Sequence, residues 1–180
     1  GTGAGVLLAA AGVLIGLRNV PENRAPSVSF AAVLANYRII LGNPLAKICY
    51  GAVFLEGIAI FGIIPYIAPL LVTVGEPRAK IAGLVVAGFA LGAVVYSSLV
   101  TFFVRRLTPR QLMWLGSGIA AAGLVTVGYT PPWPVQALAL GALGFGFYML
   151  HNCIQVQMME LAPGARGSAV ALHASSFFMG

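Results

Sequence analysis

Glu56 is the residue of this 180-residue sequence whose position most strongly suggests a chemical role. It lies inside a long apolar stretch and, on a helix that enters a bilayer at Ile48, would sit roughly 5 Å before the midplane, at about 1.5 Å per residue. A charged side chain at that depth costs about 2.5–3.5 kcal/mol on insertion scales, so such residues usually face a cavity. We expect Glu56 to carry a proton or to contact a cationic substrate. The structural alternative is a protonated carboxyl group that is hydrogen-bonded to a neighbouring helix.

A second polar set lies in an apolar stretch near the end of the sequence, and its members are His151, Asn152, Gln155 and Gln157. His151 and Gln155 are four residues apart and share a helical face, with Asn152 beside it. Histidine titrates near physiological pH, so this set can bind protons or substrate. A hydrogen-bonded cluster that closes the inner mouth of a helical bundle is the alternative.

Aromatic side chains in the same stretches can line a cavity for an apolar or cationic ligand, although each one alone is more often a packing residue. Tyr66 and Tyr148 are retained as candidates for substrate binding. The sequence has no phosphate-binding loop, no HExxH or GxSxG motif and no clustered carboxylates. Cys49 and Cys153 have neither metal-binding nor disulfide spacing. We therefore expect neither an enzyme nor a cofactor or metal site.

The composition requires that these residues be positioned in a membrane. Hydrophobic residues make up 59% of the sequence and charged residues only 8%, whereas soluble domains carry about 25% charged residues. The net charge of +6 comes from loops between apolar stretches, a pattern typical of membrane topology and not of nucleic-acid binding.

Six apolar stretches are candidates to cross the bilayer, which takes about 20 residues per helix. They are helices because an open strand edge in lipid would leave backbone groups unpaired. The predicted spans end near Leu17, cover Ile48–Val72, Ile81–Val104, Gln111–Tyr129 and Pro134–Gln157, and begin near Gly167. Both ends of the sequence lie inside apolar stretches, so we expect the first and last helices to be incomplete and the protein to extend in both directions.

The connectors alternate in charge, and this predicts the topology. Eight basic residues lie in the first, third and fifth connectors, and two lie in the second. By the positive-inside rule the basic side is cytoplasmic. The first connector, Arg18–Lys47, is long, and Ser27–Leu41 within it is predicted to form a short helix at the membrane surface.

Small residues and prolines indicate how the helices pack. Gly88 and Gly92 are four residues apart, as are Gly12 and Gly16, a spacing that lets helices approach closely where lipid gives no hydrophobic drive to associate. Pro65 and Pro69 remove backbone donors and allow a bend in the second span.

The order of several short motifs resembles the C-terminal half of the major facilitator superfamily, near its drug and sugar efflux branches. The motifs are Leu41-Gly42-Asn43-Pro44, Phe54-Leu55-Glu56-Gly57 followed by Pro65-Tyr66, Arg105-Arg106-Leu107-Thr108-Pro109-Arg110, His151-Asn152 with Gln155, Glu160-Leu161-Ala162-Pro163 and Arg166-Gly167-Ser168-Ala169. The arginine-rich motif is similar to the degenerate second copy of the family's basic motif, but it lacks the acidic residue of the fuller form. The gating charge pair of that form is therefore not carried over.

The resemblance implies a domain organisation. Residues 1–17 would end helix six of twelve, residues 18–47 would be the central cytoplasmic loop, and residues 48–180 would be helices seven to eleven, the last one incomplete. Arg105, Arg106, Glu160 and Arg166 would be candidates for a cytoplasmic gate, with Glu160 and Arg166 forming a weak latch worth about 0–1 kcal/mol.

The resemblance also implies a function: a secondary transporter of the inner membrane, an antiporter that exports a small molecule by alternating access and exchanges it for protons. Its partners would be the substrate, protons, lipid and the N-terminal half of the same transporter. A non-transporting membrane subunit or scaffold and an intramembrane enzyme remain alternatives. A subunit would need no polar cavity, and an enzyme would bring several catalytic side chains to one depth.

Overall fold

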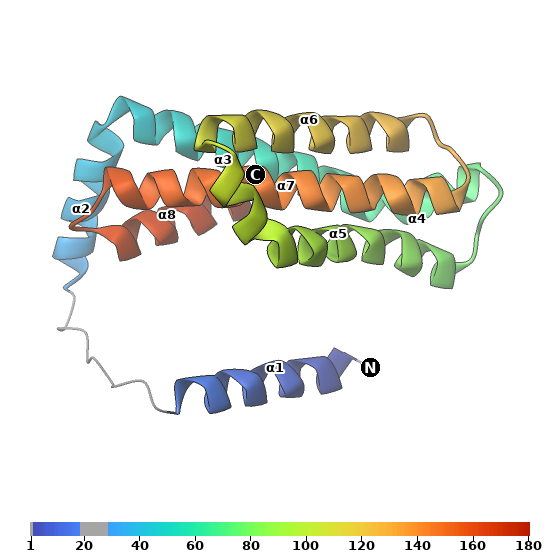
Figure 1. The fold of residues 1–180 in the computed structure, drawn as a ribbon, viewed down its shortest axis with the longest axis horizontal. Helices are drawn as coiled ribbons and strands as arrows, with labels where there is room; N and C mark the ends of the chain where they lie inside the picture. Colours follow the sequence, from blue (N-terminus) through green and yellow to red (C-terminus); the bar gives the residue numbers. More distant parts are fainter. Residues whose placement is uncertain (1, 19–28) are drawn as a thin grey trace. The chain divides into compact units, whose positions relative to one another are not determined.

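A computed structural model describes residues 2–18 and 29–180, and within these ranges the chain is helical and contains no strand (Figure 1). The chain divides into two compact units, residues 1–32 and residues 33–180. The elements are α1 (Thr2–Leu17), α2 (Phe30–Gly42), α3 (Pro44–Ile63), the 3-10 turn η1 (Ile64–Tyr66), α4 (Ile67–Thr73), α5 (Ala79–Arg106), α6 (Pro109–Gly128), α7 (Trp133–Leu161) and α8 (Arg166–Met179).

Four helical segments of the described residues are long and apolar enough to cross a membrane: Pro44–Thr73, Ala79–Arg106, Pro109–Gly128 and Trp133–Leu161. They coincide with the second to fifth predicted spans. The predicted number of six spans is not confirmed, because α1 has 16 residues and α8 has 14, fewer than the roughly 20 that a bilayer needs. The predicted helical architecture is confirmed for residues 2–18 and 29–180, which include four helical segments long and apolar enough to cross a membrane.

The short helix expected in the first connector is present as α2, Phe30–Gly42. The start of the predicted segment, with Ser27, lies outside the described residues, as does Arg24. Ile40 of α2 packs against Ala46 of α3 and Ala169 of α8, which places α2 at the end of the second unit where both of these helices begin (Figure 1).

The helix ends follow from local sequence. The Asn43 side chain accepts a hydrogen bond from the Leu45 backbone N–H at 3.0 Å, and Pro44 occupies the first turn of α3, where no backbone donor is needed. Thr108 and Gln111 form a capping box at the start of α6. These caps end the preceding connectors sharply and fix where α3 and α6 begin.

The bend predicted from the prolines is present. The apolar segment from Pro44 to Thr73 changes from α-helix to a 3-10 turn at Ile64–Tyr66 and back to α-helix. Pro65 lies in this turn, since proline removes the N–H that a continuous helix would use. Pro69 lies in the first turn of α4, where its missing N–H has no helical partner to lose.

Helix α7 is the centre of the second unit and packs along α5 and α6. Of its most apolar window, 44% is buried, against 17–22% in the other three candidate spans. A methyl group on Gly92 would overlap the Gly141 backbone, and one on Gly116 would overlap the Gly146 carbonyl oxygen. The predicted role in close helix contact is confirmed for Gly88 and Gly92 of α5, whereas a methyl group on Gly12 or Gly16 would meet nothing within 4 Å. Gly116 of α6 was not among the predicted residues.

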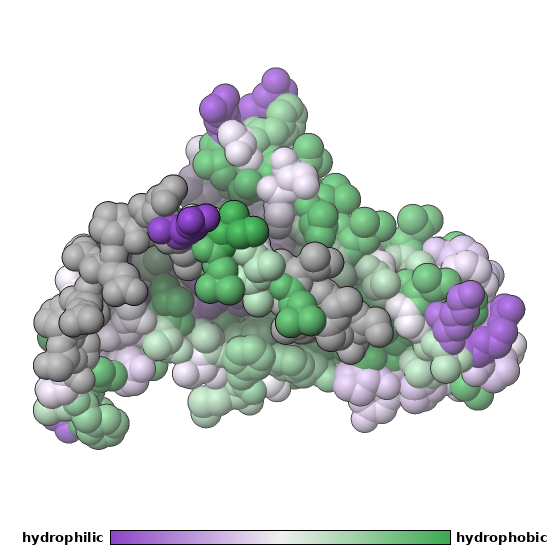
Figure 2. Space-filling model, turned by 90° about the horizontal axis from the view of Figure 1, so that it is seen from below, coloured by the Kyte–Doolittle hydropathy of each residue, from purple (hydrophilic) through white to green (hydrophobic). Residues whose placement is uncertain are grey.

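The outward surfaces of these helices are apolar. Leu91 of α5 is 65% exposed, Trp114 of α6 is 73% exposed and Leu138 of α7 is 76% exposed. On the face shown in Figure 2, apolar residues predominate and strongly hydrophilic residues form a few separate groups. Such a surface is suited to lipid and not to water.

Helix α8 lies against α3 at close range. The backbone of α8 at Phe177 approaches Gly57 of α3 so closely that a side chain on Gly57 would overlap it. The Tyr50 hydroxyl donates to the Ala169 carbonyl oxygen at 3.3 Å, and Asn36 of α2 donates to the Ser168 hydroxyl at 3.3 Å. These contacts fix the depth of α8 relative to α3.

The connector between α4 and α5 carries an ion pair. Arg78 Nε donates to Glu76 Oε1 at 2.6 Å. This hydrogen bond from the guanidinium holds the pKa of the Glu76 carboxyl group below its ordinary value. The ion pair thereby offsets the charge of Arg78, which lies on the side of the bundle whose connectors carry fewer basic residues.

The close contact at Gly92 predicts a difference between two glycines of the same helix. Gly92→Ala is expected to lower stability by about 1–3 kcal/mol, because the added methyl group forces α5 away from α7. Gly83→Ala, whose methyl group would meet nothing within 4 Å, is the matched control and should not lower stability. Thermal unfolding of the purified full-length protein in detergent measures both, and equal unfolding temperatures would contradict the contact.

The predicted orientation is tested by two single cysteines in a background without Cys49 and Cys153. Pro132→Cys, between α6 and α7, should react with a membrane-impermeant thiol reagent in intact cells. Arg106→Cys, at the end of α5, should react only after permeabilisation, because basic connectors remain on the cytoplasmic side. Labelling of both cysteines from the same side would refute the topology.

Candidate functional site

The structure joins two residues that the sequence identified separately. Glu56 Oε2 of α3 lies 2.7 Å from His151 Nδ1 of α7, 95 residues away in the chain. The two side chains are 8% and 16% exposed, Glu56 being the more buried. This is a part-buried contact between two titratable side chains, and removal of one partner from such a pair is destabilising.

His173 of α8 is a third member of the site, and it was not among the residues predicted from the sequence. Its side chain is buried, with 2% exposure, and its ring packs edge-on against that of His151 with centroids 4.3 Å apart. We call Glu56, His151 and His173 the Glu–His–His cluster. His173 could have been identified because it is one of only two histidines in the sequence and lies in an apolar helix.

Aromatic rings surround the histidines of this cluster. The Phe147 ring stacks on His151 with centroids 5.0 Å apart, and the Phe177 ring meets His151 edge-on at 5.2 Å. These rings shield part of the His151 imidazole from water, and a lower local dielectric strengthens electrostatic interactions inside the cluster.

The cluster is incompletely hydrogen-bonded. Among the described residues, the buried side-chain polar atoms without a partner are Glu56 Oε1, His173 Nε2 and Gln136 Oε1. The first two belong to the cluster. An unpaired buried polar atom costs about 1–3 kcal/mol, so two such atoms in one cluster indicate a site that can accept further partners.

The Glu56–His151 pair contributes one side chain to each of two cavities. His151 lines a cavity of about 240 Å³ with an aromatic lining that includes Phe61, Phe89 and Tyr148. Glu56 lines a second cavity of about 450 Å³ between α3, α6 and α7, which also contains Arg110. A change in the pair therefore alters the walls of both cavities.

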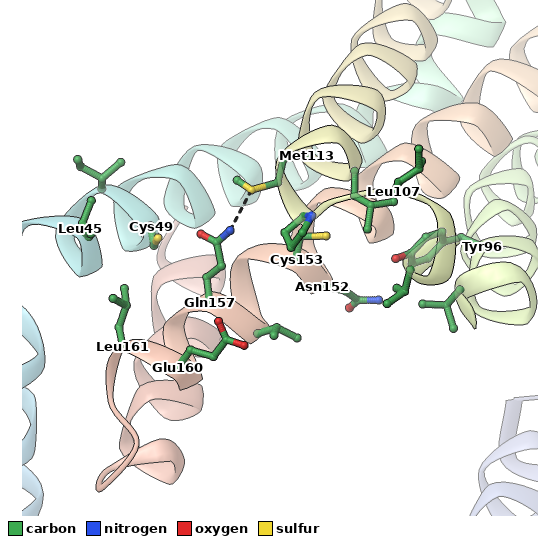
Figure 3. A pocket seen from close by; sticks show the side chains of 16 residues that line it. Leu45, Cys49, Tyr96, Leu107, Met113, Asn152, Cys153, Gln157, Glu160 and Leu161 are labelled. Carbon is green, nitrogen blue, oxygen red and sulfur yellow. Dashed lines mark hydrogen bonds between the residues drawn. The ribbon is translucent and has the colours of Figure 1, made fainter. Parts of the chain in front are cut away.

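A larger cavity of about 650 Å³ lies toward the basic end of the bundle (Figure 3). Its lining is mostly apolar and comes from α3, α5, α6 and α7, with both cysteine thiols in its wall. Its polar side chains are Asn152, Gln157 and Glu160 of α7, and the Tyr96 hydroxyl. The Gln157 amide donates to Met113 Sδ at 3.5 Å, and Asn152 points toward Tyr96 (Figure 3). A volume of about 300–1,000 Å³ is typical of ligand sites.

The remaining predicted residues are dispersed. Tyr148 lines the aromatic cavity, but Tyr66 lies in η1 and is 67% exposed, away from the cluster. Gln155 is half-buried and lines none of the three cavities. The structure separates two of these residues, because Asn152 points into the large cavity and His151 toward Glu56, and the roles predicted for His151, Asn152 and Gln155 stay predictions.

The candidate gate residues lie at the basic end and are exposed. Arg105 and Arg106 end α5, where the Arg106 guanidinium carbon lies 4.3 Å from the centroid of the Phe102 ring. The predicted latch is not formed, since no contact within 4.0 Å joins Glu160 and Arg166 in the described part of the chain. Both side chains are exposed, and an exposed pair gains too little to order two mobile side chains.

Comparison with known proteins gives one match. The sequence profile of the Major Facilitator Superfamily matches residues 2–180, nearly the whole chain. No curated protein and no solved structure matches the chain.

The Glu56–His151 contact predicts strong thermodynamic coupling. His151→Leu should destabilise the protein by about 3 kcal/mol or more, because it leaves a buried carboxylate without its partner. The double variant Glu56→Leu/His151→Leu should be less destabilised than the sum of the two single variants by at least about 1 kcal/mol. Asn152→Leu, next to His151 on α7, is the control and should show no such coupling to Glu56→Leu. Additive effects of the paired substitutions in thermal unfolding would show that the contact does not form.

Proposed function

Because this chain belongs to the major facilitator superfamily, and is therefore a multi-pass membrane transporter of a small molecule, we propose that it is a proton-coupled antiporter. In this proposal it exports its substrate across the inner membrane by alternating access. The chain supplies the C-terminal half of the transporter, and an N-terminal half completes the central cavity.

One observation carries the proposal of proton coupling: the buried contact of 2.7 Å between Glu56 and His151. A carboxyl group and an imidazole are the side chains best suited to exchange protons near neutral pH. The contact joins α3 to α7. A change in the protonation of either side chain therefore alters the attraction between these two helices. Such a link between protonation and helix packing is what coupled transport requires.

The proton gradient supplies sufficient energy for export. One charge that moves through 100 mV releases about 2.3 kcal/mol, which sustains a substrate gradient of roughly fiftyfold. A single proton on the Glu56–His151 pair per cycle is therefore enough for useful accumulation outside the cell.

The three cavities support a small amphipathic substrate. The large cavity joins an apolar wall to amide and carboxylate groups of α7, among them Asn152 and Glu160. The cavity beside Glu56 shares Ile48, Cys49 and Met113 with the large cavity, so these two cavities adjoin each other. We propose that the substrate passes from the large cavity toward the pair and that protonation of the pair resets the site.

Export is favoured over uptake by the efflux-like motifs of α3 and α7, Phe54-Leu55-Glu56-Gly57 and His151-Asn152. The arginine-rich connector between α5 and α6 supports an orientation in which the large cavity opens toward the cytoplasm. A substrate could then enter from the cytoplasm.

A non-transporting membrane subunit is the second candidate function. Such a protein would need a polar residue only for helix packing, with no open volume beside it. Glu56 instead lines a cavity of about 450 Å³, which favours transport.

Glu56→Gln in the full-length protein tests the proposal. The first step is an efflux assay with a panel of dyes, amphipathic cations and sugars in a strain that lacks its own pumps. With a substrate from that panel, Glu56→Gln should reduce proton-driven efflux at least about tenfold, because a carboxamide does not release a proton. Exchange of substrate across the membrane without a proton gradient should persist.

Glu160→Gln provides the control, since Glu160 is an exposed acid that lines the large cavity without a contact to His151. Any effect of Glu160→Gln should be equally large on proton-driven efflux and on exchange without a proton gradient. Proton-driven efflux that is as fast in Glu56→Gln as in the wild type would refute the proposed proton site.

A further inference from the structure

His173 is a buried titratable side chain that the proposed proton site does not yet use. It faces His151 with ring centroids 4.3 Å apart, and its Nε2 atom has no partner. We propose that His173 receives the incoming proton and that its charge drives the proton of His151 onto Glu56, which then becomes neutral. This inference rests on the proposed proton site and specifies how that site works.

The geometry brings three exchangeable positions into one row. The carboxylate oxygen Oε2 of Glu56 is within hydrogen-bond distance of Nδ1 of His151. His151 contacts both of the other members, because its Nδ1 meets the Glu56 carboxylate and its ring packs against that of His173. Each group comes from a different helix, namely α3, α7 and α8, so the row crosses the packed centre of the second unit.

Few other charged or titratable groups face the row. On α3 the Tyr50 hydroxyl is engaged by the Ala169 carbonyl oxygen of α8. On α7 Tyr148 lines the aromatic cavity beside His151, and on α6 Arg110 lines the cavity beside Glu56. Phe147 and Phe177 cover the remaining sides of His151. The charge of the row is therefore set mainly by its own three members.

Two imidazolium groups with ring centroids 4.3 Å apart repel each other strongly when both rings are largely shielded from water. Like charges in such a site disfavour the charged form of each other, so His151 and His173 hold one positive charge between them. Before proton uptake this charge is on His151, where the Glu56 carboxylate neutralises it. After uptake the charge is on His173, which has no carboxylate beside it.

The proton balance of the step is simple. One proton binds the nitrogen of the neutral His173 imidazole that carries no hydrogen; Nε2 of this ring is buried and has no hydrogen-bond partner. The proton on His151 Nδ1 then moves across the 2.7 Å contact to Glu56 Oε2. The row begins with no net charge and ends with a net charge of +1, carried by His173, while Glu56 and His151 are both neutral. The strong attraction between α3 and α7 is thereby replaced by a neutral hydrogen bond.

The consequence for packing lies in α8. His173 is 2% exposed, and a charge without a partner is unstable in such surroundings. Charging of His173 therefore favours movement of α8 away from α3 and α7, toward a state in which His173 reaches water. Protonation and helix movement become a single event in this site.

Infrared difference spectroscopy of the purified full-length protein tests this step without any transport assay. Acidification should produce the band of a protonated carboxyl group, and the loss of this band in Glu56→Gln assigns it to Glu56. In His173→Gln the midpoint of the band should move to lower pH by at least about one unit, a tenfold loss of proton affinity. His173→Phe, which keeps a ring in the same space, should show the same shift.

Gln136→Leu is the matched control, because Gln136 is also fully buried with an unpaired oxygen but lies outside the cluster. It should leave the midpoint unchanged. A midpoint in both His173 variants that equals the wild-type value would overturn the proposal, as would a carboxyl band of Glu56 that persists at high pH.

Histidine nitrogen resonances of the wild-type protein give a second measurement that holds even if the His173 variants fail to fold. As the pH falls, His173 should become an imidazolium over the same range in which His151 becomes neutral. A His151 that stays an imidazolium while His173 titrates would overturn the inference. If the infrared shift is observed but Glu56→Gln leaves proton-driven efflux intact, the charge transfer stands and the proposed function fails.

Discussion

Close backbone contact between α7 and its neighbours is the constraint on which the rest of this structure depends. In lipid, helices gain no hydrophobic free energy from association, so packing must come from contact itself. Gly92 and Gly116 let α5 and α6 approach α7 until backbone meets backbone. Because α7 is held on both sides, His151 projects toward α3 and α8 at a fixed depth. A looser contact would let α7 rotate, and the distance to Glu56 would no longer be defined.

The buried ionisable groups are stable because they meet each other. A lone carboxylate in the centre of a membrane protein is expensive, and so is a lone imidazolium. The pair Glu56–His151 offsets part of this cost, yet Glu56 Oε1 and His173 Nε2 remain without partners. Unpaired buried atoms reduce stability, so these two open positions offset part of what the Glu56–His151 contact contributes.

Much of the fold could be predicted from the sequence because the membrane imposes simple rules. The four long helical segments, Pro44–Thr73, α5, α6 and α7, could be predicted from the length of the apolar stretches, and the break at η1 could be predicted from Pro65. The site was predictable only in part. Glu56 and His151 were identified by their polar character in apolar helices, but their contact depends on helix rotation, which composition does not encode. His173 was missed because a single histidine in a short helix resembles a packing residue. The Glu160–Arg166 pair was wrong because sequence proximity does not order exposed side chains.

The position of Glu56 suggests why one site can serve both a proton and a cationic group. The carboxylate is held by His151, and it can leave this partner only if its charge is removed or if another cation replaces the imidazolium. A proton does the first and a positively charged group in the neighbouring cavity does the second. The two events exclude each other, because a neutral carboxyl group attracts a cation weakly and a bound cation disfavours protonation. Competition of this kind is reciprocal by thermodynamic linkage, as the proposed exchange of substrate for protons requires.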